Sequence, residues 1–204
     1  DQVAMVVPFQ ETLERDLLVV EAIAADLKQY LLSDVLYWSL SKPYPSPYIL
    51  PKGTLGGLLL RLHRLTALEE RLDPEQRQRL GRAAGQARDE LDRWAVQAEE
   101  KAVREFKARL HAWQVFLEEC QDAPNRYAYE YPTQVEGRAI LALLLDFAAD
   151  AIGPQAVRKL RAADHMLREI TEPGEFVWDE AALPAFPEER FWWLYVRLKP
   201  RAEG

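Results

Sequence analysis

The chain has 204 residues, of which 49% are hydrophobic, and its 33 acidic and 26 basic side chains give a formal charge of −7. This length suits one domain, or a core with a small appendage, and the apolar content excludes intrinsic disorder. The single cysteine, Cys120, excludes a disulfide framework and a cysteine-based zinc site, and the longest near-apolar stretch, at 139–152, is too short to span a bilayer.

Helix-forming residues dominate the composition. Leucine and alanine together number 57, whereas the β-branched valine, isoleucine and threonine number 23. Leucine and alanine lose little conformational entropy in a helix, while β-branched side chains are penalised in helices and preferred in strands. The sequence therefore predicts an all-α protein.

The N-terminal third of the chain predicts two helices separated by a proline-rich segment. Apolar residues repeat every three or four positions from 12 to 40, which indicates one helix with Thr12 as its N-cap. Four prolines in the stretch 41–53 exclude a helix interior and favour an extended path. A second helix should begin near Thr54 and bury a row of leucines that ends at Leu72.

A long spine helix is predicted over 74–121. Asp73 is a suitable N-cap, and Pro74 suits the first helical position. The weakest point is the pair Gly81 and Gly85, because each glycine costs about 1 kcal/mol relative to alanine in a helix. A helix of this length should outrun its neighbours, so we expect its exposed apolar seam to need a partner, such as an antiparallel second copy.

The last third predicts two more helices and an aromatic tail. The apolar helix over 133–152 should lie at the centre of the core, and Gly153 with Pro154 should end it and begin another helix, which reaches about residue 170. Beyond it, prolines and aromatic residues predict a tail with a short helix at 188–198. We therefore expect about five main helices in a bundle over 1–171, with 172–204 packed on it as a tail.

Two aromatic clusters are candidate interface residues. Tyrosine and tryptophan are favoured at binding hot spots, and they are equally suited to fastening a loop or tail to a helical body. Trp192 and Trp193 are about 100° apart on a helix, so at least one of them should cover the body. The candidates are Tyr127, Tyr129 and Tyr131 in the loop and Phe191, Trp192, Trp193 and Tyr195 in the tail.

Arginines concentrated between residues 61 and 88 form a candidate nucleic-acid surface. This stretch holds seven arginines against four acidic residues, and arginine attracts phosphates. The rest of the chain is acidic, which opposes such binding, and arginines on helices also form pairs with acidic residues one turn away. The candidates are Arg61, Arg64, Arg71, Arg77, Arg79, Arg82 and Arg88.

Two weaker candidates for ligand chemistry remain in the sequence. Lys52, Gly53 and Thr54 open the second helix, where backbone N–H groups can bind an anion, although simple capping explains them as well. Asp34 and Asp146 are acids in apolar surroundings that would serve an enzyme or ligand carrier only within a pocket. We predict no catalytic residue, metal site or cofactor, because nucleophile, nucleotide-binding and metal-ligand motifs are not recognisable.

The leading hypothesis from the sequence is a non-enzymatic interaction protein. It would be an assembly, adaptor or regulatory subunit that binds a protein partner or forms a homo-oligomer. The alternatives are a nucleic-acid-associated helical subunit and a helical-bundle enzyme or small-ligand carrier. Since no secretory signal or membrane span is recognised, we expect a cytoplasmic location and no membrane contact.

Overall fold

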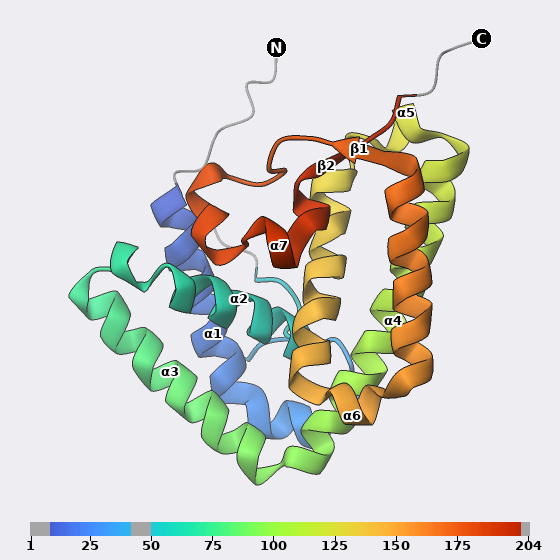
Figure 1. The fold of residues 1–204 in the computed structure, drawn as a ribbon. Coiled ribbons are helices and arrows are strands. Elements are labelled where there is room, and N and C mark those ends of the chain that lie inside the picture. Colours follow the sequence, from blue (N-terminus) through green and yellow to red (C-terminus); the bar gives the residue numbers. More distant parts are fainter. Residues whose placement is uncertain (1–8, 42–49, 201–204) are drawn as a thin grey trace. The chain divides into compact units, whose positions relative to one another are not determined.

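The computed structural model describes residues 9–41 and 50–200 (Figure 1). Helices occupy 79% of this part of the chain, which confirms the all-α prediction. The chain divides into two compact units, one that ends at Ala98 and one that begins at Glu99. The extended path predicted for the proline-rich segment falls mainly on residues outside the described ranges.

In the first unit, α2 and α3 both pack on α1, as the ribbon shows (Figure 1). The row of apolar residues predicted along α1 is buried, and this burial holds the three helices together. The described elements of this unit are α1 (Phe9–Leu32), α2 (Leu55–Ala67), the 3-10 turn η1 (Glu69–Arg71) and α3 (Pro74–Arg93).

Local capping chemistry fixes where α2 and α3 begin. The hydroxyl of Thr54 accepts the backbone N–H of Gly57 at 2.9 Å at the start of α2. Asp73 and Gln76 form a reciprocal capping box at the start of α3, with Pro74 in the first turn. Both starts were predicted from the sequence.

The first helix ends earlier than predicted, at Leu32 rather than near residue 40. The N–H and hydroxyl of Ser33 both donate to the carbonyl of Tyr30, which closes the last turn. The chain then folds back along α1, since the indole N–H of Trp38 donates to the carboxylate of Asp26 at 3.0 Å. The buried carboxylate of Asp26 on α1 thus binds Trp38, whose apolar spacing alone would have placed it in a continued helix.

The predicted spine helix over 74–121 is two helices, α3 and α4 (Ala95–Asp122), which meet at Trp94. Trp94 has φ −115° and ψ 41°, its indole N–H donates to the Glu90 carboxylate at 3.1 Å, and the Lys28 ammonium lies 6.0 Å from its ring. Gly81 and Gly85 lie inside α3, where an added methyl group would meet nothing within 4 Å. The interruption therefore lies at Trp94, nine residues beyond Gly85, and not at the glycine pair.

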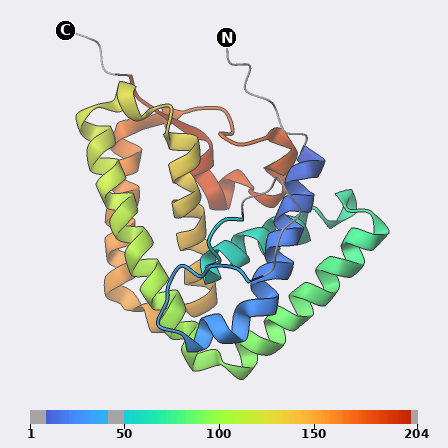
Figure 2. The same ribbon diagram turned by 180° about the vertical axis from the view of Figure 1, so that it is seen from behind.

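In the second unit, α6 (Tyr131–Ile170) reverses its direction and forms two limbs that lie side by side (Figures 1 and 2). Its backbone leaves helical values at Ala148 and at Gly153, where φ is +78°. The first limb, 131–147, and the second limb, 154–170, correspond to the two helices predicted on either side of Gly153 and Pro154. By length and composition α6 is apolar enough to cross a membrane, but the reversal divides it into two shorter rods.

Because the spine divides at Trp94, the described chain has six main helices where about five were expected. The remaining elements of the second unit are short. They are α5 (Pro124–Tyr127), β1 (Thr171–Pro173), η2 (Glu180–Ala185), α7 (Glu188–Phe191), η3 (Trp192–Leu194) and β2 (Val196–Leu198).

The tail folds back onto α6 through a small antiparallel sheet. β1 pairs with β2 in the register Thr171 to Leu198, and the indole N–H of Trp178 donates to the carbonyl of Pro132 at 2.8 Å. The short helix predicted at 188–198 ends at Leu194, because the residues after it pair with β1. Strand pairing, which depends on a segment more than twenty residues earlier, overrides the local helical pattern.

Candidate functional site

Three of the aromatic interface candidates belong to the core. Phe191, Trp193 and Tyr131 are 0%, 3% and 2% exposed. The guanidinium carbon of Arg138 lies 3.6 Å above the ring of Trp193, and the hydroxyl of Tyr131 donates to the carbonyl of Trp193 at 2.7 Å. Burial also raises the pKa of the Tyr131 hydroxyl. These side chains fasten the tail to α6 and are not accessible to a partner.

The other aromatic candidates lie nearer to the surface. Trp192 is half-buried beneath the guanidinium of Arg168, at 3.7 Å, and Tyr195 is half-buried with its hydroxyl hydrogen-bonded within the tail. Tyr127 is half-buried beside α4, so Tyr129, which is 92% exposed, is the one candidate that projects into solvent. One exposed aromatic ring does not form a contact surface by itself.

Three of the seven candidate arginines bind carboxylates of α1. Arg64 donates to the buried carboxylate of Asp16 at 2.8 Å, and the Nε of Arg61 lies 3.4 Å from the same group. Arg79 donates to both carboxylate oxygens of Glu21, at 2.9 and 2.8 Å, and this pairing raises the pKa of Arg79 further. These arginines hold α2 and α3 on α1, which is a structural role.

The remaining arginine candidates do not form one basic face. Arg71 lies 5.8 Å from the ring of Phe9. Arg77, Arg82 and Arg88 are exposed on α3, which also carries acidic residues at both of its ends. Mixed charge of this kind is typical of a solvated helix.

The candidate anion site at the start of α2 is accounted for by local structure. The Thr54 hydroxyl is occupied as the helix cap, and the Lys52 ammonium donates to the hydroxyl of Ser39. A methyl group added to Gly53 would lie 2.9 Å from the Cδ2 of Leu40, so an alanine there would need the end of the Leu40 side chain to shift.

The two candidate acids do not form a site. Asp34 is exposed just beyond the end of α1, so it does not lie in the apolar surroundings predicted for it. Asp146 is also exposed and pairs with Arg190 of the tail, and it lies in the other unit. Among the residues that the structure describes, no three histidine, cysteine or carboxylate side chains are placed to hold a metal ion.

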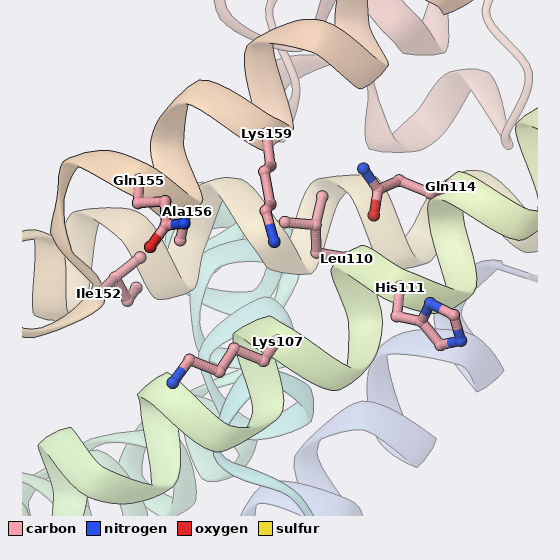
Figure 3. A pocket seen from close by; sticks show the side chains of 8 residues that line it. All are labelled: Lys107, Leu110, His111, Gln114, Ile152, Gln155, Ala156 and Lys159. Carbon is pink, nitrogen blue, oxygen red and sulfur yellow. The ribbon is translucent and has the colours of Figure 1, made fainter.

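A groove that the sequence analysis did not anticipate lies in the second unit, between α4 and α6 (Figure 3). It has a volume of about 430 Å³, and Lys159 extends from α6 into the space between the helices, toward Leu110. The lining residues are Lys107, Leu110, His111 and Gln114 from α4 and Ile152, Gln155, Ala156 and Lys159 from α6.

The groove combines an apolar floor with polar rims. Leu110 and Ile152 are 4% and 7% exposed, and Ala156 adds a small apolar side chain beside them. On the rims Lys107, His111 and Lys159 are exposed. A bound group can therefore bury apolar surface on the floor while it meets donors on both sides.

The surroundings of the groove are strongly basic in an otherwise acidic chain. The stretches 101–117 and 151–163 hold seven lysines and arginines and one acidic residue, while the whole chain has a formal charge of −7. That acid, Glu105, is fully buried and accepts a hydrogen bond from the Nε of Arg109 at 2.7 Å. Lys107 and Lys159 are exposed on the rims, and Arg158 and Arg161 are exposed nearby on α6. The groove is therefore a locally basic part of an acidic chain, which attracts anionic groups.

The chemistry available in the groove is that of binding. Lysine ammonium groups and glutamine amides bind carboxylates and phosphates, whereas the eight lining residues include no carboxylate, thiol or hydroxyl. A signal for the groove is present in the sequence, since Lys107 and His111, like Gln155 and Lys159, are four residues apart and share a helix face. Nothing in the sequence indicates that these two faces meet.

Comparisons with known proteins give no family for this chain. No protein-family model matches the sequence. Comparison with curated proteins and comparison with solved structures also gave no match. The function is therefore inferred from the groove itself.

Proposed function

We propose that this chain is a non-enzymatic interaction subunit that binds an acidic segment of a partner protein in the basic groove between α4 and α6. The observation that carries this proposal is the concentration of positive charge around a groove of about 430 Å³ on an acidic chain. A cleft lined by charge of one sign raises the local concentration of an oppositely charged partner and speeds its association.

The composition of the groove favours a protein ligand over a nucleic acid. Its floor, formed by Leu110 and Ile152, is suited to an apolar side chain, which an acidic peptide supplies and a phosphate backbone does not. Proteins that bind single strands stack bases on aromatic rings, and the lining of this groove has no phenylalanine, tyrosine or tryptophan.

The proposal is tested with two charge-reversal variants that change the net charge equally. In the groove variant, Lys107→Glu and Lys159→Glu reverse one cation on each rim. In the control variant, Arg77→Glu and Arg82→Glu reverse two exposed cations on α3. The probe is a short fluorescein-labelled peptide of glutamate, alanine and leucine, and its binding is measured by fluorescence anisotropy.

We expect the groove variant to bind the peptide at least about tenfold more weakly than the wild type, because each surface charge pair contributes about 0.5–1 kcal/mol and reversal adds repulsion. The control variant should bind within about twofold of the wild type. Raising the salt concentration should weaken wild-type binding, since screening shortens the range of surface electrostatics.

Three results would contradict the proposal. One is no binding of the peptide to the wild type, and another is equal loss in both variants. The third is binding of a single-stranded or duplex oligonucleotide that is tighter than binding of the peptide and is lost in the groove variant. That result would make the chain a nucleic-acid-associated subunit. Light scattering on the free protein is a separate check. If the wild type self-associates and only the groove variant does not, a second copy of this chain occupies the groove, which also contradicts the proposal.

A further inference from the structure

We infer that the segment bound in the basic groove is an amphipathic α-helix, with one apolar side chain on the floor and carboxylates about one helical turn to either side. This inference rests on the proposed function and specifies the form of the ligand. It is carried by the lining of the groove, which combines buried apolar residues with exposed polar residues from two different helices.

The directions of the lining groups favour a helical ligand. A ligand that reaches the α4 rim, the floor and the α6 rim together must project side chains in three directions. Residues at i−4, i and i+4 of a helix lie about 40° apart around its axis, so the central side chain can point at the floor while its neighbours one turn away lean toward the two rims. Successive residues of an extended strand point to opposite faces, so a strand reaches two of the three.

The spacing of the rim groups agrees with a helical turn. Lys107 and His111 are four residues apart on α4, and Gln155 and Lys159 are four residues apart on α6. Four residues of helix advance about 6 Å, which is the distance between side chains at i and i+4 of a bound helix. Carboxylates repeated at this interval can therefore meet donors along each rim.

The backbone of the ligand gives a second reason for a helix. The walls of the groove are helices, whose backbone N–H and C=O groups already bond within α4 and α6. An extended segment in the groove would find no strand edge to pair with, and its own backbone groups would be left without partners where they are covered. A helix satisfies its backbone internally and can lie in a groove between two others.

The experiment compares three labelled peptides of identical composition and charge. The helical peptide places glutamates at i−4 and i+4 around a central leucine and is locked by a side-chain lactam between two positions on its opposite face. The scrambled peptide carries the same lactam, but its glutamates are distributed around the helix. The linear peptide has the sequence of the helical peptide without the lactam. Anisotropy gives the affinities, and circular dichroism reports helix formation in the linear peptide.

We expect the helical peptide to bind at least about tenfold more tightly than the scrambled peptide, and the linear peptide to gain helicity on binding. Replacement of the central leucine of the peptide by glutamine should weaken binding without any change to the protein. On the protein, Ala156→Phe should fill the floor and weaken the helical peptide, while thermal unfolding by circular dichroism verifies that this variant is folded.

The outcomes separate the two proposals. Equal affinity of the helical and scrambled peptides, or binding of the linear peptide without a gain of helicity, would overturn the helical ligand and leave the acidic-ligand proposal standing. Failure of all three peptides to bind the wild type, or binding that Lys107→Glu with Lys159→Glu does not weaken, would overturn both.

Discussion

The substitution Asp164→Asn tests whether Arg138 is a buried cation that depends on a single anionic partner. The Arg138 side chain is 6% exposed, and its Nε and Nη2 donate to the two carboxylate oxygens of Asp164 at 2.7 and 2.8 Å. Its Nη1 has no hydrogen-bond partner among the described residues, and the ring of Trp193 covers one face of the guanidinium at 3.6 Å. Loss of the carboxylate charge would leave a cation in a site of low dielectric constant.

The expected cost follows from this geometry. Removal of one partner of a buried ion pair costs about 3–5 kcal/mol, and we expect about 3 kcal/mol here because Asp164 is 19% exposed. For a chain of this size, such a loss lowers the melting temperature by roughly 6–12 °C. Replacing both partners, in Arg138→Met with Asp164→Asn, should recover most of the loss, since no uncompensated charge is then buried.

The assay is thermal unfolding monitored by circular dichroism, with hydrogen exchange measured by mass spectrometry to localise the effect on the two limbs of α6. The matched control is Asp146→Asn, which removes an exposed carboxylate of the same unit that pairs with Arg190, and we expect it to cost less than about 1 kcal/mol. If Asp164→Asn melts at the same temperature as this control, or if the double variant is less stable than Asp164→Asn, the reasoning about a buried cation is refuted.

Two further predictions concern glycine positions and the cysteine. Gly53→Ala should destabilise the protein by about 1 kcal/mol or less in urea unfolding, because its methyl group would lie 2.9 Å from the Cδ2 of Leu40, whose side chain must shift. Gly81→Ala, with nothing within 4 Å, should stabilise the protein by about 0.5–1 kcal/mol, and the opposite order of the two variants would contradict the packing described here. Cys120 is 0% exposed, and burial raises its pKa to about 12. A thiol reagent at about pH 8 should therefore label Cys120 only after the protein unfolds. Fast labelling of the native protein would contradict its burial. Because the unfolded thiol ionises near pH 8.5, the free energy of unfolding should fall as the pH rises from about 9 toward 12.

The parts of the fold that could be predicted are those that local chemistry determines. Thr54 and Asp73 cap the helices that follow them, and Gly153 with Pro154 marks the reversal of α6. Each of these features depends on a few neighbouring residues, such as a side-chain acceptor near free N–H groups or a glycine that adopts positive φ. The apolar spacing along α1 also identified its buried face.

The errors in the prediction arose where distant residues decide the backbone. Nothing near residue 94 breaks a helix by propensity, yet the indole of Trp94 binds Glu90 and lies beside Lys28 of α1. The end of α1 similarly depends on Asp26, whose carboxylate accepts the indole N–H of Trp38 after the chain has turned back. Periodicity records which residues are apolar, and it does not record where a tertiary contact redirects the chain.

The candidate site shows the same limit. Several of the arginines and aromatic residues that stood out by number serve packing, as the pairing of Arg79 with Glu21 and the burial of Trp193 show. The basic groove was missed because its residues come from two helices and lie between 38 and 52 positions apart in the sequence, and each half is an ordinary polar helix face. Its charge becomes distinctive only when α4 and the second limb of α6 are placed together.

The most direct test of groove recognition is the ratio of two dissociation constants for one acidic peptide. The first belongs to the variant with Lys107→Glu and Lys159→Glu, and the second to the variant with Arg77→Glu and Arg82→Glu, which has the same net charge. We expect a ratio of about ten or more at low salt, and a smaller ratio as salt screens the rims. A ratio near one would show that only overall charge matters, and it would contradict recognition by the groove.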